Sequence, residues 1–179
     1  MKLHIGCREK NLIGWKHFDV RKIDEHIDYV GTADDLSQFS DNSIDEIYAC
    51  HLLEHFGRQG GVEKALAEWH RVLRQGGKLR VAVPDFEAIA TEYMQNHNLK
   101  QLLGLLYGGQ NYEYNFHYMT FDFDLLKELL ERIGFSNIQR YDWKTFLPEN
   151  YDDFSRAYLP HMQFETGRLM SLNVVCEKK

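Results

Sequence analysis

Several short polar segments in the first half of the chain carry side chains suited to binding a metal, a cofactor or a proton. The segment His51-Leu52-Leu53-Glu54-His55 has the spacing H-x-x-E-H, in which two histidines bind zinc and the glutamate activates water. Here the motif directly follows a predicted strand, and the usual context of inverted zinc peptidases is absent. We therefore predict no metal ligands and keep a zinc hydrolase built on His51, Glu54 and His55 as an alternative.

The other polar segments also follow predicted strands. Gly6-Cys7-Arg8 ends the first strand, Asp19 ends the second, Thr32-Ala33-Asp34-Asp35 follows the third, and Pro84-Asp85 ends the fifth. Ligands of open α/β sheets bind beyond the carboxyl ends of the strands. These side chains, together with His51 after the fourth strand, are therefore expected to gather at one edge of a sheet.

The elements that must position these residues alternate between strand-like and helix-like stretches. Apolar residues at helical spacing from Val62 to Leu73, followed by Gln75-Gly76-Gly77, predict one helix and its end. Such alternation is typical of a parallel sheet covered by helices. The predicted strands are 2–6, 17–20, 27–31, 43–50, 78–83, 138–143 and 170–176, and the predicted helices are 62–73, 86–95, 99–107 and 122–133.

The order of motifs covers nearly the whole chain and is more specific than any one motif. It resembles the class I S-adenosylmethionine (SAM)-dependent methyltransferases. More narrowly, it resembles a small subfamily of predicted methyltransferases associated with polysaccharide and cell-surface biosynthesis. The matching segments are 3–7, 14–19, 41–48, 51–55, 71–85, 107–110, 116–118 and 129–135.

The resemblance implies the fold. It implies an α/β, Rossmann-like three-layer sandwich with a mostly parallel seven-stranded sheet, whose last strand is antiparallel beside the sixth. The stretch between Gly6 and His17 is too short for the usual first helix, so the first crossover is shortened. We expect a single domain over residues 1–179, with a lid insertion at about 86–123 and a second insertion at about 145–169.

The resemblance also implies the cofactor, SAM, and the residues that bind it. A glycine at position 6 lets the backbone approach the cofactor, and an acid after the second strand accepts the ribose hydroxyls. Arg8 stands where the family has a further glycine, and Thr32 stands where it has an aspartate, so that Asp34 or Asp35 is the candidate for adenine. The predicted cofactor-binding residues are Gly6, Cys7, Arg8, Asp19, Asp34, Asp35 and His51.

An aromatic run from Asn111 to Phe123 is expected to form the substrate lid, since long insertions over strand ends carry binding. Its aromatic faces suit sugar rings and flat aromatic acceptors equally. It contains no lysine or arginine, which argues against nucleic acid. For O-methylation, we expect His117 to remove the acceptor proton, with Asp85 and His51 as the other candidate bases.

Composition sets the remaining expectations. The 179 residues include 21 basic and 27 acidic side chains, giving a net charge of −6 that disfavours a nucleic-acid binder. Three scattered cysteines and the lack of a long apolar run or signal peptide favour a cytoplasmic protein without a membrane span. The aromatic surface from Tyr107 to Tyr118 equally suits contact between two copies, a homodimer.

Two further functional classes stay open. One is a non-catalytic module that binds SAM or a partner through a degenerate glycine loop, a hypothesis motivated by Arg8 and the short first crossover. The other is a nicotinamide enzyme, which is disfavoured because G-x-G-x-x-G is missing. Methyl transfer to a small-molecule acceptor, a sugar, lipid-linked intermediate or other metabolite, is the preferred hypothesis.

Overall fold

A seven-stranded sheet with the order β3-β2-β1-β4-β5-β9-β6 forms the centre of the computed structural model, which describes residues 1–179. Strands β1 to β5 are parallel, and β9 is antiparallel to both neighbours, β5 and β6. This confirms the predicted sheet, including the antiparallel last strand beside the sixth. The strands are β1 (Lys2–Ile5), β2 (Lys16–Asp19), β3 (Tyr29–Val30), β4 (Ile44–Cys50), β5 (Leu73–Pro84), β6 (Phe135–Arg140) and β9 (Ser171–Lys178).

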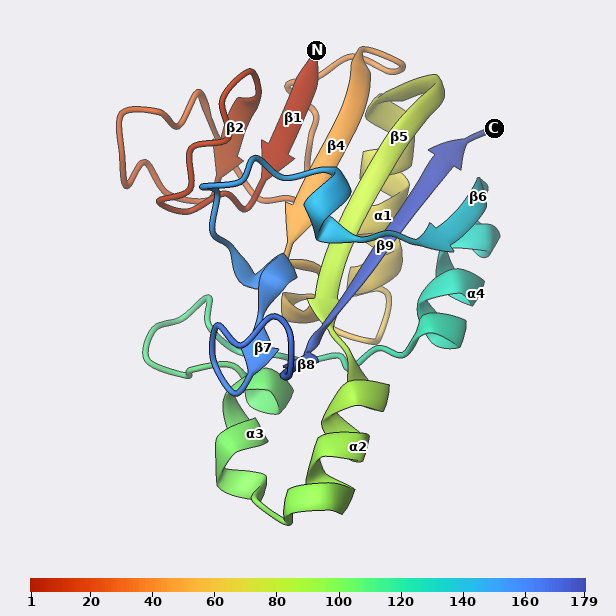
Figure 1. Ribbon diagram of the computed structural model, residues 1–179. Coiled ribbons are helices and arrows are strands. Elements are labelled where there is room, and N and C mark those ends of the chain that lie inside the picture. Colours follow the sequence, from red (N-terminus) through yellow and green to blue (C-terminus); the bar gives the residue numbers. More distant parts are fainter.

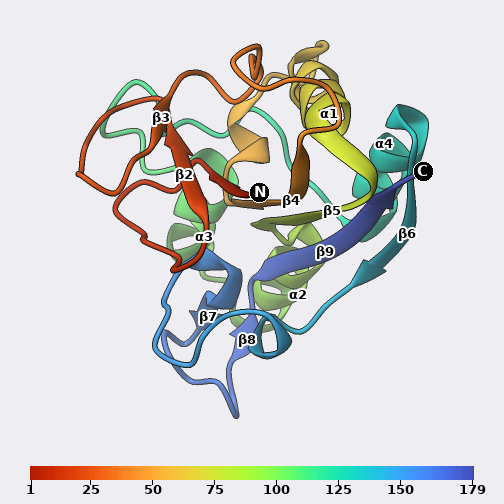
Figure 2. The ribbon, with the colours of Figure 1, turned by 90° about the horizontal axis from the view of Figure 1, so that it is seen from above.

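The two faces of the sheet have different covers. Helices α1 (Gly61–Val72) and α4 (Phe123–Ile133) lie on one face, and the segment 141–169 crosses the other (Figures 1 and 2). The helical face is apolar, and the fully buried Trp69 is its largest side chain. The opposite face is aromatic, since Tyr48 packs there with Trp143 and Leu147. No helix combines the length and apolarity that a membrane span requires.

The first three crossovers contain no helix, and hydrogen bonds between side chains and their backbone order them instead. These crossovers are the segments 6–15, 20–28 and 31–43. In the first, the backbone N–H of Leu12 donates to His17 Nε2 at 2.9 Å. The shortened first crossover expected from the sequence is therefore confirmed.

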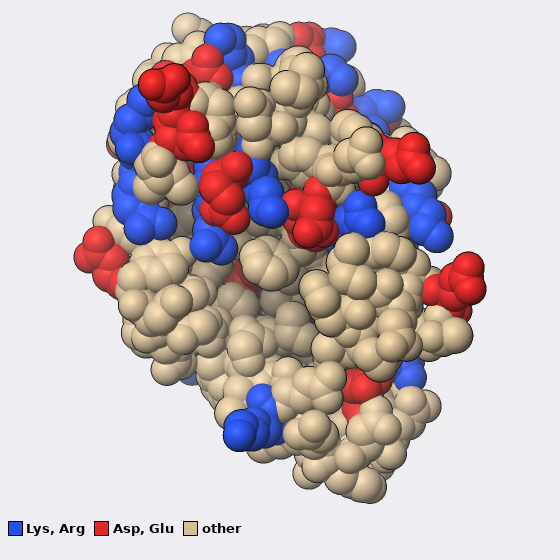
Figure 3. All heavy atoms as spheres, turned by 60° about the vertical axis from the view of Figure 1, so that its left-hand side comes forward, with Lys and Arg blue, Asp and Glu red and all other residues tan.

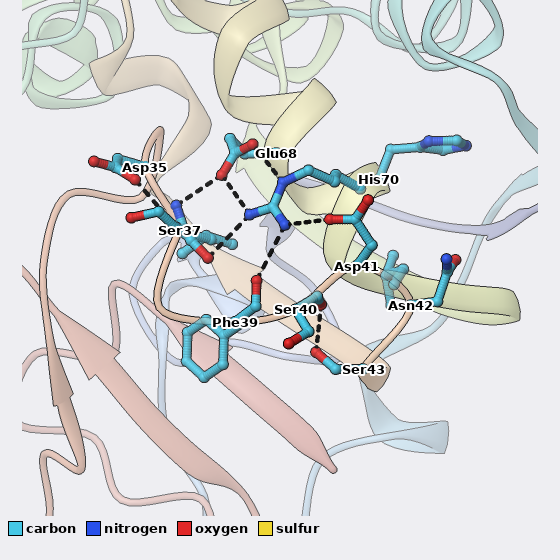
Figure 4. Close-up of polar contacts among 12 residues, drawn as sticks. Asp35, Ser37, Phe39, Ser40, Asp41, Asn42, Ser43, Glu68 and His70 are labelled. Atoms are coloured by element: carbon cyan, nitrogen blue, oxygen red, sulfur yellow. Dashed lines mark hydrogen bonds and ion pairs between the residues drawn. The ribbon is translucent and has the colours of Figure 1, made fainter.

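The third crossover is fastened to α1 by Arg71. Its guanidinium donates to both carboxylate oxygens of Glu68, to Asp41 Oδ1, and to the carbonyl oxygens of Leu36 and Phe39. Figure 4 shows these hydrogen bonds, with Glu68, Asp41 and Phe39 labelled. The network satisfies all five guanidinium donors and replaces the helix that would otherwise order this crossover.

A helical hairpin extends beyond the carboxyl end of β5. It consists of α2 (Phe86–Asn96) and α3 (Leu99–Tyr107) and projects away from the sheet in Figure 1. Asp85 begins α2, because its Oδ1 accepts the backbone N–H groups of Glu87 and Ala88 at 3.0 and 3.4 Å. After α3, the chain returns along the strand ends to Asp122, which caps α4.

Short elements complete the fold. The hairpin of β7 (Tyr158–Leu159) and β8 (Arg168–Leu169) was not predicted, and β6 begins three residues earlier than expected because it follows Gly134 directly. The 3-10 helices are η1 (Leu53–His55), η2 (Trp143–Thr145) and η3 (Phe154–Arg156).

Candidate functional site

A cavity of about 280 Å³ lies at the carboxyl ends of β1, β2, β3 and β4. Figure 3 shows a hollow on this side of the molecule, with most charged side chains in view above it and mainly uncharged residues below. The volume is near the lower end of the range for small-molecule sites, about 300–1,000 Å³. The lining residues are Gly6, Arg8, Phe18, Asp19, Val20, Arg21, Gly31, Thr32, Ala33, Asp34, His51, Leu52, His55, Phe56, Tyr112, Glu113, Tyr114, Phe116 and Tyr118.

Gly6 forms the cavity wall where β1 ends. Its φ of +67° is a left-handed conformation that favours glycine, and a Cβ there would lie 2.9 Å from both methyl groups of Leu52. Leu52 also lines the cavity. Glycine is therefore required both by the backbone turn and by close packing against Leu52, a contact that the sequence did not indicate.

Asp19 lies at the end of β2 and is buried beside the cavity. Its Oδ2 accepts the backbone N–H of Arg8 at 2.9 Å, and its Oδ1 accepts that of Arg21 at 3.2 Å. Each carboxylate oxygen keeps a second lone pair. The side chain therefore orders the loops after β1 and β2 and can still accept two hydroxyl groups.

The residues after β3 separate into two groups. Thr32 and Asp34 line the cavity, whereas Asp35 accepts the backbone N–H of Ser37 at 3.1 Å and does not line it. Asp34 accepts from Lys64 Nζ at 2.8 Å. Burial of Asp34 opposes ionisation, but the hydrogen bonds from Lys64 and Thr32 prevail and lower its pKa. Of the two predicted acids, the structure brings only Asp34 into the site.

Arg8 and Cys7 continue the turn after Gly6. Arg8 lines the cavity, and its Nε lies 3.5 Å from a carboxylate oxygen of Glu9. Cys7 is buried and does not line the cavity. Burial, with a contribution from Asp19, raises the pKa of the Cys7 thiol to about 12, so that this cysteine packs as a small apolar group.

Side chains of the return segment from Gly108 to Phe121 close the cavity opposite the strand ends. Tyr112 and Tyr114 lie over the guanidinium of Arg21, whose carbon is 4.7 and 5.9 Å from the two ring centroids. Arg21 Nε is buried and has no hydrogen-bond partner. The aromatic lid was expected from the sequence but Arg21 was not, since only the fold brings the loop after β2 under these rings.

His51 directly follows β4 and lines the cavity. Its Nε2 lies 3.1 Å from Ser171 Oγ, and that hydroxyl donates to Asn173 Oδ1. Since the Asn173 amide nitrogen donates to Ser155 O, the direction of this chain is fixed. His51 Nε2 therefore carries the proton, and the bare Nδ1 faces Glu54 Oε1 at 3.5 Å. Burial, together with nearby histidines, lowers the pKa of His51 to about 3.

Glu54 is the most unusual side chain near the cavity. It is completely buried, and neither carboxylate oxygen has a hydrogen-bond partner. Burial raises its pKa to about 8. His51 and His55 do not share the face of an α-helix, because only the three residues of η1 are helical here. The arrangement is therefore not that of an inverted zinc peptidase.

The other two predicted bases do not line the cavity. Asp85 caps α2 through its Oδ1, and its Oδ2 accepts from Arg140 at 3.1 Å, so both oxygens serve structural contacts. His117 instead lies close to Glu54, with 3.9 Å between its Nε2 and Glu54 Oε1. Burial lowers the pKa of His117. Residues 145–169 do not line the cavity either, since they cover the aromatic face of the sheet.

Comparisons with known proteins agree with this geometry. Residues 10–81 match the family model described as a methyltransferase domain. A SAM-dependent methyltransferase from Thermotoga maritima superimposes with a TM-score of 0.58 at 19% identity, covering 99% of this chain and 82% of that chain. The chain has the fold of a SAM-dependent methyltransferase.

Two archaeal structures extend the structural likeness. A SAM-dependent methyltransferase from Archaeoglobus fulgidus gives a TM-score of 0.59 at 13% identity, with 99% of this chain and 85% of that chain covered. One from Methanosarcina mazei gives 0.56 at 15% identity, with 99% and 91% covered. No curated protein matches the sequence. The methyltransferase-domain match and the fold together support a SAM-dependent methyltransferase.

Proposed function

We propose that this protein transfers the methyl group of SAM to a hydroxyl group of a small-molecule acceptor. The observation that carries the proposal is the cavity at the carboxyl ends of β1 to β4, where Gly6 and Asp19 meet in a chain with a methyltransferase domain. In an open α/β sheet this is the edge at which ligands bind.

The residues present fit the cofactor. Asp19 has free lone pairs for the two ribose hydroxyls, and Thr32 and Asp34 offer hydrogen-bonding groups for adenine. The unpartnered Nε of Arg21 offers a buried donor at the cavity. When bound, SAM supplies an electrophilic methyl group, so the tasks of this chain are to bind and orient both reactants and to exclude water.

The proposed acceptor is a sugar, free or lipid-linked, of the kind used in polysaccharide or cell-surface biosynthesis. The exposed Tyr114 and Tyr118, and the partly buried Tyr112 and Phe116, give the lid side of the cavity flat aromatic faces. Such faces pack well against the apolar surfaces of sugar rings. The proposal includes the cytoplasmic location expected from the sequence.

Titration calorimetry with SAM and S-adenosylhomocysteine tests the cofactor part of the proposal. We expect one site per chain and weaker binding of both ligands by Tyr114→Ala, because this ring and Arg21 close the cavity. The matched control is Tyr93→Ala, which removes an exposed tyrosine from α2 outside the cavity. Absence of binding to either ligand by the wild-type protein would overturn the proposal.

Transfer itself is tested with SAM labelled in the methyl group and a panel of free and lipid-linked sugars. We expect label in an acid- or base-stable ether product of at least one sugar class. A second function, a non-catalytic SAM-binding module, is favoured by one observation: neither Asp85 nor His117 lines the cavity. Tight binding of S-adenosylhomocysteine without transfer to any acceptor in the panel would favour that function.

A further inference from the structure

Three side chains near the cavity have the types and the proximity of a metal-binding site. Glu54, His55 and His117 each offer a ligand atom, and these atoms all lie within 4.8 Å of one another. Glu54 and His55 are neighbours in η1, whereas His117 comes from the return segment. The backbone N–H of Tyr118 donates to the carbonyl oxygen of Glu54 at 2.8 Å and fastens the return segment against η1.

Glu54 provides the independent sign that a ligand belongs here. Its carboxyl group is completely buried and lacks any hydrogen-bond partner. No lysine or arginine pairs with it, and its ionic neighbours are His51 Nδ1 at 3.5 Å and His117 Nε2 at 3.9 Å. A buried polar group without a partner is costly, and a buried carboxylate is normally paired or bound to a metal.

The two histidines are already oriented as metal ligands. His55 Nδ1 lies 3.0 Å from the carbonyl oxygen of Phe116, and His117 Nδ1 lies 3.0 Å from that of Leu105. Because a carbonyl oxygen only accepts, each Nδ1 carries the proton and each Nε2 keeps its lone pair. Backbone carbonyls that fix the second ring nitrogen are typical of the surroundings of metal-binding histidines.

The separation of two of the ligand atoms leaves room for an ion. The 3.9 Å between His117 Nε2 and Glu54 Oε1 is too long for a hydrogen bond. Ligand atoms that share one zinc ion at about 2.0–2.2 Å in tetrahedral geometry are separated by roughly 3.3–3.6 Å. A contraction of a few tenths of an ångström would bring these two atoms to that separation.

The ligand set also selects the class of metal. Two imidazoles and one carboxylate suit zinc and neighbouring divalent transition metals, whereas magnesium and calcium prefer oxygen ligands. Three protein ligands leave a coordination position open, as in catalytic rather than structural zinc sites. Of the three residues, His55 lines the cavity, so the site would border the space in which substrates bind.

We propose that Glu54, His55 and His117 bind one divalent transition-metal ion, of the Zn²⁺ class, in the wall of the cavity. This departs from the prediction of no metal ligands. It also differs from the zinc-hydrolase alternative, since Glu54 is a ligand rather than a base and His117 takes the place of His51. The role of the ion rests on the proposed function: it would bind the acceptor hydroxyl and favour its deprotonation.

The test uses protein stripped with a chelator and titrated with Zn²⁺ by calorimetry. We expect one site per chain, and at least a roughly 10- to 100-fold loss of affinity in Glu54→Gln and His117→Asn. Electronic absorption of the Co²⁺-loaded protein should show a low-symmetry site that both substitutions abolish. The matched control is His161→Asn, an exposed histidine outside the cluster, which should bind Zn²⁺ as the wild-type protein does.

Binding of S-adenosylhomocysteine, measured on the same preparations, separates this proposal from the proposed function. Glu54→Gln that binds S-adenosylhomocysteine normally but not Zn²⁺ would confirm a folded protein with a specific metal site. Zinc binding that Glu54→Gln and His117→Asn leave unchanged would overturn the site. Zinc binding without cofactor binding would support the metal site and overturn the methyltransferase proposal. Cofactor binding without zinc binding would support the methyltransferase proposal and overturn the metal site.

Discussion

Substitution of Gly6 by alanine should weaken cofactor binding as well as the fold. The residue has φ +67°, and placing a non-glycine residue in this left-handed region costs about 1–2 kcal/mol. The new Cβ would lie 2.9 Å from both methyl groups of Leu52, so this side chain must move. Leu52 lines the cavity, and its displacement would narrow the space for the ligand.

The two effects can be measured separately. Backbone strain is present with and without ligand, so it lowers the free energy of unfolding but does not enter the dissociation constant. Overfilling of a packed site costs about 1–3 kcal/mol. Because the displaced Leu52 side chain overfills the cavity when ligand is bound, this cost reduces the binding free energy. S-adenosylhomocysteine should therefore bind Gly6→Ala about 5- to 150-fold more weakly than wild type.

Gly14→Ala is the matched control for this prediction. Gly14 has φ +86°, has no atom within 4 Å of an added Cβ, and does not line the cavity. Urea unfolding should show a loss of stability in both variants, and calorimetry should show weakened binding in Gly6→Ala alone. Adding Leu52→Ala to Gly6→Ala should restore part of the affinity. Wild-type affinity in Gly6→Ala, or an equal loss in Gly14→Ala, would refute the reasoning.

Three further predictions concern stability. Lys178 Nζ donates to the carbonyl oxygens of His70 and Leu73 at 2.7 and 2.9 Å. Lys178→Met removes both hydrogen bonds and should therefore lower the free energy of unfolding, measured in urea, by about 2–4 kcal/mol. Arg71→Lys should cost about 1–3 kcal/mol in the same assay, since an ammonium group cannot replace five planar donors. Burial lowers the pKa of His4 to about 3, below the unfolded value of 6.5, so the folded state binds fewer protons between these values. The stability that neutral His4 contributes is therefore lost as pH falls below about 6.5, and the loss reaches roughly 2 kcal/mol at pH 5. His4→Phe should remove this part of the pH dependence when the free energy of unfolding is measured from pH 7 to 5.

Much of the fold follows from local patterns that the sequence displays. The apolar spacing of α4 and its Gly134 stop predict that helix almost to the residue. Strands β1, β2 and β4 are largely buried because both faces of the sheet are covered, and polar residues follow them at the edge where the cavity lies. The family resemblance adds what periodicity alone cannot supply, the antiparallel insertion of β9 between β5 and β6.

The parts that the sequence could not predict depend on contacts between distant segments. Asp85 follows a predicted strand and His117 lies in the predicted lid. Whether each side chain points into the cavity depends on its rotamer, which the sequence does not show. Asp85 caps the start of α2 and accepts a hydrogen bond from Arg140. His117 forms a hydrogen bond with the carbonyl oxygen of Leu105 and lies beside Glu54. Neither outcome has a signature in residue spacing.

Asp19 shows why the glycine is the sharper probe of the site. No helix lies in the first crossover to order the loop after β1, and Asp19 instead accepts the backbone N–H groups of Arg8 and Arg21. Substitution of Asp19 would therefore release both loops and remove the proposed ribose acceptor in one step. A loss of cofactor affinity in Asp19→Asn would not distinguish these causes. Gly6→Ala, set against Gly14→Ala, isolates the effect on the cavity because the two substitutions share the backbone strain and differ in the contact with Leu52.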